Sequence, residues 1–309
     1  MFFEEKGIRV ELMRASFVIL HYMTIQDTQK CIDSIITTIE YDNYSIVVVD
    51  NGSTNSSGAE LEKAYAENEK IKIIILKENL GFAKGNNLGY QYAKKKEKAE
   101  LIIILNSDTI INDSKFINKI LESYKNDKFY ILGPDIITLE GEHQNPLRNR
   151  RLTKREVEKR IFNKTIFLIY YKLKKILRVG DNFNVLEKLF EKTSQKNRLN
   201  VQYKKFREDV VLQGACLIYS YDYIKNEENA FVSDTFMYGE EDLLAHFCSV
   251  MHYKMVYNPK IGIVHMDGSS TKKTCKNTLD KNIFFTKYTL EGAKILLNKM
   301  KEAPLDSED

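Results

Sequence analysis

Four short apolar runs alternate with helix-like segments over the first 125 residues, and this alternation constrains the fold more than any other feature. The apolar runs are residues 15–22, 45–49, 72–76 and 101–105. The segments with hydrophobic residues at helical spacing are residues 24–39, 56–68, 81–96 and 114–125. Strands that are apolar on both faces have to be covered on both faces, and strands joined by helices run parallel. The sequence therefore predicts an α/β fold, with a mostly parallel sheet and flanking helices.

Polar residues follow these strands at one edge of the predicted sheet, where folds of this kind bind ligands. Asp50 follows the second strand, a segment rich in glycine and asparagine begins at residue 81, and Asn106-Ser107-Asp108 follows the fourth strand. Asn106 and Asp108 are two residues apart on extended backbone, so they point to the same side. Oxygen ligands there suit Mg²⁺ or Mn²⁺, and such a metal would hold a substrate diphosphate. The alternative is a simple turn, because all three residue types favour turns.

The middle of the chain breaks the alternation. Residues 148–178 contain 12 lysines and arginines against two glutamates, and they surround the apolar, aromatic run 166–171. A basic helix with an apolar face suits the surface of an anionic membrane. A helical insertion that packs its apolar face on the main domain fits equally well. Nucleic acid is a weaker interpretation, because the aromatic residues cluster instead of alternating with the charges.

Ordered patterns return after residue 210. A strand-like stretch is interrupted by Gly214 and Ala215, whose small side chains let a ligand approach the backbone closely. Residues 236–254 predict a loop followed by a helix, and residues 255–265 predict two short strands. Residues 278–300 predict a terminal amphipathic helix, with an acidic tail after it.

Composition excludes several classes of protein. The 47 lysines and arginines nearly balance 43 acids, and a net charge of +4 is too small to indicate a nucleic-acid binder. The four cysteines have no metal-ligand spacing, so we expect free thiols in a reducing compartment. Acidic residues precede any apolar run at the N-terminus, which argues against a signal peptide. No run of about 20 apolar residues predicts a membrane-spanning helix.

Four motifs in a fixed order resemble the family 2 glycosyltransferases with the GT-A fold. The motifs are VVVDNGS at 47–53, NLGFAKGNN at 79–87, LNSD at 105–108, and FMYGEED with VHMDGSS between 236 and 270. The likeness covers about residues 16–113 and 210–270, and it is greatest to bacterial rhamnosyltransferase-like members that build capsule, O-antigen or cell-wall polysaccharides. It implies an inverting transfer of a sugar from a nucleoside diphosphate to a glycan.

The resemblance also implies a division of the chain. Residues 1–147 would form the nucleotide-sugar-binding half of the GT-A domain, and residues 208–275 the acceptor and catalytic half. The basic helical insertion would span residues 148–207 between them, and residues 276–309 would add a C-terminal helix and tail.

Several site residues follow from the resemblance on the donor side. Asp108 matches the last acid of the family's DxD motif and would bind Mg²⁺ or Mn²⁺. Asn106 replaces the first acid, so it offers an uncharged oxygen to the metal or contacts the ribose instead. His265 either completes the metal shell or contacts the diphosphate, unless it is a hydrogen-bonded structural residue. Asp50 would read the nucleobase, and its alternative role is a turn or helix-cap residue before Gly52.

Other positions would serve the sugar and the acceptor. Asn86 and Asn87 would contact the nucleotide or the sugar, or else cap the loop. Gly214 and Ala215 would line the sugar site. The acceptor hydroxyl needs a carboxylate to take its proton, and three acids follow one another at 240–242. Counting back without gaps from Asn258-Pro259 selects Glu241 as the base, whereas matching a Glu-Asp pair selects Asp242.

We prefer Glu241 and keep Asp242 as the second candidate. The remaining acids would stabilise the first turn of a helix through its dipole. The donor would be dTDP-rhamnose or a UDP-hexose, and the acceptor a polyprenyl-linked glycan. Without a spanning helix, the enzyme would act from the cytoplasm, peripherally on the inner face of the cytoplasmic membrane. A homodimer is left open.

Two other nucleotide-binding classes lack their signals. A nucleotidyltransferase needs a basic, glycine-rich loop after the first strand, and a dehydrogenase needs GxGxxG there, but residues 21–24 supply neither. A catalytically weak or inactive carbohydrate- or membrane-binding protein of the same fold is the remaining alternative, because Asn106 replaces an acid. The acids Asp108, Glu241 and Asp242 favour an enzyme.

Overall fold

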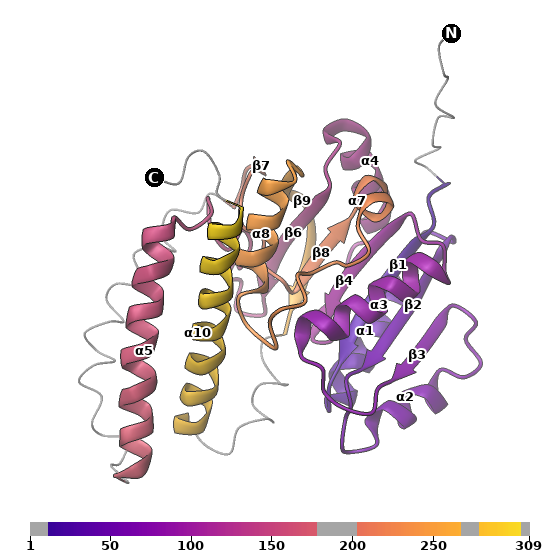
Figure 1. Ribbon diagram of the computed structural model, residues 1–309. Coiled ribbons are helices and arrows are strands. Elements are labelled where there is room, and N and C mark those ends of the chain that lie inside the picture. Colours follow the sequence, from indigo (N-terminus) through magenta and orange to yellow (C-terminus); the bar gives the residue numbers. More distant parts are fainter. Residues whose placement is uncertain (1–11, 178–202, 267–277, 304–309) are drawn as a thin grey trace.

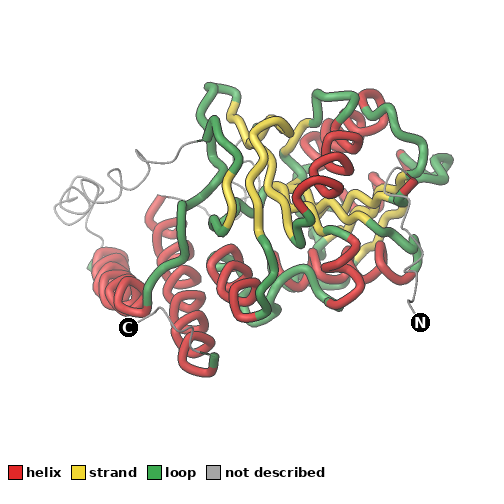
Figure 2. Tube along the Cα trace, turned by 90° about the horizontal axis from the view of Figure 1, so that it is seen from above, coloured by secondary structure: helices red, strands yellow, loops and turns green. Residues whose placement is uncertain are grey.

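The computed structural model describes residues 12–177, 203–266 and 278–303, and these residues form a twisted central sheet with helices on both faces (Figures 1 and 2). The strands are β1 (Ala15–His21), β2 (Tyr44–Asp50), β3 (Ile71–Ile75), β4 (Leu101–Asn106), β5 (Thr109–Ile110), β6 (Ile131–Thr138), β7 (Arg207–Glu208), β8 (Cys216–Tyr219) and β9 (Met255–His265). The helices are α1 (Ile25–Thr38), α2 (Ser57–Ala64), α3 (Phe82–Lys95), α4 (Phe116–Asp127), α5 (Lys154–Ile176), α7 (Tyr221–Asn226), α8 (Glu240–Val250) and α10 (Thr278–Glu302).

The strands follow the order β3-β2-β1-β4-β8-β6-β9-β5, and β7 pairs with β9. β1 to β4 are parallel to one another, and β6 is parallel to β9, whereas β8 is antiparallel to both of its neighbours. The predicted α/β fold with a mostly parallel sheet is confirmed. The carboxyl ends of β1, β2 and β4 therefore meet at one edge.

Side chains alternate between two cores along each central strand. Ile46 and Val48 of β2 pack in the core beneath α1, α2 and α4, while Val47 and Val49 pack in the core beneath α3, α7 and α8. Both faces are apolar because both are covered, which explains the continuous hydrophobic runs. Whether a residue at the end of a strand has an even or an odd position in this alternation therefore decides which of the two cores its side chain faces.

One prediction for the second half of the chain is wrong in detail. Residues 255–265 form the single strand β9 instead of two short strands. Its register against β6 shifts between Pro134 and Asp135, which pair with Asn258 and Gly262. The intervening residues are absorbed as a bulge, so the sequence irregularity at Asn258-Pro259 bends one strand without ending it.

The long helices α5 and α10 lie side by side at the end of the sheet formed by the second half of the chain (Figure 1). Val157, near the start of α5, packs in one cluster with Leu296 and Met300 near the end of α10. At the other end, Lys175 Nζ is 2.6 Å from Asp280 Oδ1, so the two helices run antiparallel. Among the described helices, none is long and apolar enough to cross a membrane.

The predicted division at residues 147, 207 and 275 stays a prediction. Residues 178–202 of the proposed insertion, the DGSS loop at 267–270, Cys275 and the acidic tail from 304 lie outside the described residues.

Candidate active site

A cavity of about 450 Å³ opens at the carboxyl ends of β1, β2 and β4. Leu20, Asn51 and Asn106 from the strand ends line one wall. The N-terminal turn of α8 and two aromatic side chains of α10 also line the cavity; these residues are Glu240, Glu241, Phe284 and Tyr288. The cavity lies at the edge where the sequence predicts a ligand site.

Asn106, Ser107 and Asp108 all line this cavity, and the structure brings His265 to the same place. The short strand β5 pairs with β9 so that Thr109 lies opposite His265. His265 Nε2 is 3.2 Å from Asp108 Oδ1, and His265 Nδ1 is 2.7 Å from Gln144 Oε1. The contact with Gln144 fixes the ring orientation and turns Nε2 toward the Asp108 carboxylate, so that both groups could bind one metal ion.

Asp50 and Asn51 follow β2 but enter different layers. Asp50 is buried, its Oδ1 accepts a hydrogen bond from the Ser53 backbone N–H at 3.1 Å, and a Cβ added to Gly58 would collide with its carboxylate. Asn51 lines the cavity, where its Nδ2 donates to Asn79 Oδ1 and to the Gly81 carbonyl oxygen. The sequence analysis singled out Asp50 and missed Asn51, its neighbour in the same motif.

The structure does not bring Asn86 and Asn87 to the cavity wall. Both lie on α3 and are buried. Asn86 Nδ2 donates to the Phe82 carbonyl oxygen one turn earlier. Asn87 exchanges two hydrogen bonds with the backbone of Phe231, both at 2.9 Å. Asn87 therefore holds the segment around residue 231 against α3.

Gly214, Ala215 and Glu241 meet on one side of the cavity. The Asn106 backbone N–H donates to the Ala215 carbonyl oxygen at 2.9 Å, which joins this loop to the end of β4. A Cβ on Gly214 would stand 3.1 Å from Glu241 Oε1. The absence of a side chain at residue 214 leaves room for the Glu241 carboxylate and for a ligand beside it.

Asp242 points away from the cavity and into an ion-pair cluster. Arg160 Nη1 lies 2.6 Å from Asp242 Oδ2, and Arg148 Nη2 donates to Asp242 Oδ1. Burial, together with the neighbouring charge of Arg160, lowers the pKa of Arg148 to about 10. Consecutive residues of α8 therefore have different surroundings, with Glu241 in the cavity and Asp242 neutralised behind it.

Glu240 also lines the cavity, although only 4% of its surface is exposed. Burial raises its pKa to about 7, and the charge of Glu241 contributes to the shift. Thr235 Oγ1 donates to Glu240 Oε1 at 3.1 Å. Glu240 can therefore hold a proton near neutral pH beside the Glu241 carboxylate.

The wall formed by α10 depends on a close backbone contact that the sequence patterns did not reveal. Gly239 precedes α8 with a φ of +101°, and Gly292 of α10 packs directly on it. A Cβ added to Gly292 would come within 2.5 Å of the Tyr238 carbonyl oxygen. This contact sets the position of α10, and with it Phe284 and Tyr288.

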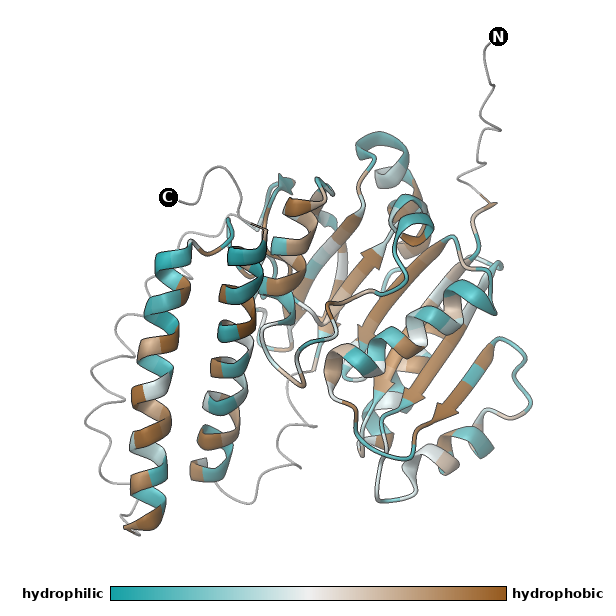
Figure 3. Ribbon diagram, in the orientation of Figure 1, coloured by the Kyte–Doolittle hydropathy of each residue, from teal (hydrophilic) through white to brown (hydrophobic). Residues whose placement is uncertain are grey.

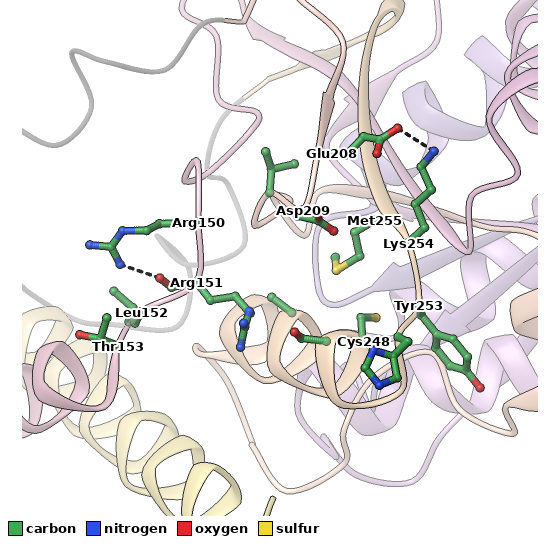
Figure 4. Close-up of a pocket in the computed structure, with 14 residues that line it drawn as sticks. Arg150, Arg151, Leu152, Thr153, Glu208, Asp209, Cys248, Tyr253, Lys254 and Met255 are labelled. Atoms are coloured by element: carbon green, nitrogen blue, oxygen red, sulfur yellow. Dashed lines mark hydrogen bonds and ion pairs between the residues drawn. The ribbon is translucent and has the colours of Figure 1, made fainter. Parts of the chain in front are cut away.

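A second cavity of about 580 Å³ lies around the C-terminal end of α8 (Figure 4). Its cationic side chains include Arg150 and Lys254. Arg150 is paired with Glu156 at 2.8 Å, and Lys254 is paired with Glu208 at 2.6 Å. These charges are already compensated, so we assign this cavity no ligand.

No group of three or more histidine, cysteine or acidic side chains that could hold a metal gathers among the described residues. Asp108 and His265 supply two ligands, and Asn106 supplies an uncharged oxygen nearby. A divalent ion there would need further oxygens, and a diphosphate offers them. The donor set therefore fits Mg²⁺ or Mn²⁺ bound together with a nucleotide.

The amino-acid sequence is similar to those of known glycosyltransferases. The family model of Glycosyl transferase family 2 matches residues 16–193. The chain is similar to the dTDP-rhamnosyl transferase RfbF of Shigella flexneri, with 34% identity over 127 residues, and to the low-salt glycan biosynthesis hexosyltransferase Agl10 of Haloferax volcanii, with 29% identity over 126 residues. Each match covers 41% of this chain, and they cover 41% and 38% of the two relatives.

The fold is also similar to that of a glycosyltransferase of known structure. S. aureus TarS 1–349 in complex with UDP-GlcNAc superposes with a TM-score of 0.56 at 12% identity, covering 95% of this chain and 68% of TarS 1–349. At this level of identity the likeness concerns the fold, and it confirms the GT-A prediction.

Proposed function

The chain belongs to the family 2 glycosyltransferases, and on that premise we propose that it moves rhamnose or a hexose from a nucleoside diphosphate to a glycan, with inversion. One observation carries the proposal: Asp108, paired with His265, and Glu241 line one cavity. An inverting displacement needs both groups, because the diphosphate leaves from one side of the reacting carbon while the acceptor oxygen attacks from the other. The donor is dTDP-rhamnose or a UDP-hexose, as the names of the relatives suggest.

The strand ends hold the donor in this proposal. Asn51 and Asn106 face the nucleotide, and Asp108 with His265 faces the diphosphate. These two residues would hold Mg²⁺ or Mn²⁺, which supplies positive charge next to the departing diphosphate. Asp50 contributes by fixing the turn at Ser53 that precedes α2, and its base-reading role stays a prediction.

Glu241 is the general base in this proposal. It takes the proton of the acceptor hydroxyl while that oxygen forms a bond to the anomeric carbon and the bond to the diphosphate oxygen breaks. Asp242 is a weaker candidate, because its carboxylate is held by Arg148 and Arg160. Glu240 is a weaker candidate too, because it is 4% exposed and its Oε1 accepts a hydrogen bond from Thr235, whereas Glu241 is only partly buried.

The acceptor is a glycan linked to a polyprenyl lipid, and α5 is the surface that reaches the membrane. The exposed apolar residues of α5 follow one stripe, with 37–73% of their surface in contact with solvent; they are Phe162, Ile166, Ile169, Leu173 and Ile176. Figure 3 shows the hydrophobic residues of α5 in brown. The exposed residues Lys159 and Lys172 flank the stripe by helical spacing, and lysines beside an apolar face favour an anionic bilayer.

A panel of nucleotide sugars tests the proposed reaction. Release of nucleoside diphosphate is measured with Mg²⁺ or Mn²⁺ for dTDP-rhamnose, UDP-glucose, UDP-galactose and UDP-N-acetylglucosamine. One pyrimidine donor should be hydrolysed well above the others, and the Glu241→Gln variant should bind that donor without turning it over. Failure to bind or hydrolyse any member of the panel would overturn the proposal.

A further inference from the structure

Three cationic side chains collect behind Glu241, where α5 meets α8 and α10. Arg148 and Arg160 both reach Asp242, and Lys164 lies one helical turn beyond Arg160 on α5. Lys164 Nζ stands 4.6 Å from the centre of the Phe285 ring. The Phe285 ring in turn packs 4.9 Å from the ring of Tyr238, which lines the catalytic cavity. The cluster therefore lies beside the part of the cavity wall that Tyr238 and Glu241 form.

The cluster carries more positive charge than its direct contacts neutralise. Among the described residues, Asp242 is the carboxylate in contact with Arg148 and Arg160, Glu156 and Glu241 act on both arginines without contact, and no carboxylate pairs with Lys164. Burial and the charge of Arg160 lower the pKa of Lys164, and burial lowers that of Arg160. Partly buried cations without counter-charge are costly unless a ligand supplies the charge.

The arginines are also still reachable. The side chains of Arg148 and Arg160 are 25% and 28% exposed, whereas that of Asp242 is 9% exposed. Each guanidinium has five N–H donors in a planar fork, so one bond to Asp242 leaves donors for a second anion. Two such forks and an ammonium suit the tetrahedral oxygens of a phosphoryl group.

We propose that Arg148, Arg160 and Lys164 form a phosphoryl-binding subsite for the acceptor, so that the accepted glycan carries a phosphate or diphosphate close to the hydroxyl that attacks. This inference rests on the proposed function, because it takes the cavity to be a glycosyl-transfer site. The same helix presents its apolar stripe on the outside. A glycan linked through a diphosphate to a lipid would thus meet the cluster with its phosphates and the stripe with its lipid.

The test uses inorganic pyrophosphate as the probe, titrated calorimetrically into the full chain with EDTA present so that no metal contributes. We expect Lys164→Gln to weaken binding about tenfold or more, since a charge-assisted hydrogen bond is lost. Lys164→Arg keeps the charge and should bind within about threefold of the unaltered protein. Lys159→Gln removes the same charge from an exposed position of α5 and should have no effect.

The controls separate this subsite from two other sources of binding. Asp108→Ala should bind pyrophosphate at least as tightly as the unaltered protein, because the probe is not on the donor side. Lys164→Gln should also bind vesicles containing phosphatidylglycerol as the unaltered protein does, because the cluster does not hold lipid headgroups. Equal affinities in Lys164→Gln and the unaltered protein, an equal loss in Lys159→Gln, or a parallel loss of vesicle binding would overturn the inference. Donor hydrolysis without an acceptor reports on the proposed function separately.

Discussion

Glu241 and Asp242 are neighbours on α8, but their carboxylates point in different directions. Successive side chains on a helix diverge by about 100°, so that one enters the cavity while its neighbour meets the arginines of the α5 side. The sequence left both as candidates for the base. The choice depends on Arg148 and Arg160, which are 94 and 82 residues away along the chain, and no local pattern reveals such partners.

Replacing Glu241 should reduce sugar transfer, whereas replacing Asp242 should reduce stability. Glu241→Gln keeps the shape but cannot accept a proton, so transfer should fall by about 10²–10⁴-fold while donor affinity is retained. Asp242→Asn removes the partner of two arginines, and breaking a partly buried pair costs roughly 3 kcal/mol of unfolding free energy. Single-turnover transfer and urea unfolding measure the two effects. A large loss of transfer in Asp242→Asn at unchanged stability would assign the base to Asp242.

The donor side makes a second prediction. Asp108→Ala should abolish the Mn²⁺-dependent part of nucleoside diphosphate binding, because it removes the charged member of the Asp108–His265 pair. Asn106→Ala should weaken binding only partly, since it removes an uncharged oxygen. Calorimetric titration of dTDP and UDP with and without Mn²⁺ distinguishes them. Unchanged affinity in Asp108→Ala would remove the metal assignment.

The raised pKa of Glu240 predicts a pH dependence of stability. An acid whose pKa is higher in the folded state, here about 7, stabilises the fold below its unfolded pKa. That contribution is lost as pH rises from about 4.5 to 7. Glu240→Gln mimics the protonated form, so its stability relative to the unaltered protein should increase over this range. Urea unfolding at pH 4.5, 5.5 and 7 tests this, and a constant difference would contradict it.

Asn51 is a residue of the cavity that the sequence motif did not identify. The motif drew attention to the charged residue, Asp50, and away from its neutral neighbour. The packing of β2 places even-numbered residues beneath α1, α2 and α4 and odd-numbered residues beneath α3, and the cavity opens on the α3 side. Which helix covers which face depends on the connections of the whole sheet. The sequence alone therefore predicted the strand end but not the side chain that lines the cavity.

At the scale of elements, β1 to β4 were predictable because their residues are apolar on both faces, whereas β5, β6 and β7 were not predicted. The extent of α10 was predictable too, from its helical periodicity, but its docking position was not. That position depends on the backbone contact between Gly239 and Gly292. The sequence pattern of a helix does not show which distant residue one of its glycines contacts. The cavity wall formed by Phe284 and Tyr288 was therefore missed.

Gly292→Ala tests this contact. Alanine favours a helix by about 1 kcal/mol over glycine, but its Cβ would meet the Tyr238 carbonyl oxygen at 2.5 Å. We expect α10 to shift, the melting temperature to fall, and KM to rise as Phe284 and Tyr288 move. Gly262→Ala is the matched control, since its Cβ would meet only an ordinary contact at 3.8 Å. Equal melting temperatures and kinetics for the two variants would contradict the role of the contact.

At the scale of the whole molecule, the apolar stripe of α5 and its flanking lysines predict reversible attachment to an anionic bilayer. Each lysine or arginine near such a surface contributes about 1 kcal/mol, and salt should weaken the attachment. Replacing Ile169 and Leu173 together by serine should reduce sedimentation with phosphatidylglycerol vesicles about tenfold or more. Leu139→Ser removes a leucine elsewhere that is even more exposed, 68% against 51% for Leu173, and should have no effect. Equal binding to neutral and anionic vesicles would refute the electrostatic part of this prediction.

The two walls of the cavity come from well-separated stretches of the chain, β1 to β4 on one side and α8 with α10 on the other. Chain recombination between relatives could exploit this separation. A chimera that exchanges residues 15–110 would replace the strand ends while retaining Glu241, the arginine cluster and α10. In such an enzyme, nucleotide preference should follow the exchanged part, and the glycan that is extended should follow the retained part.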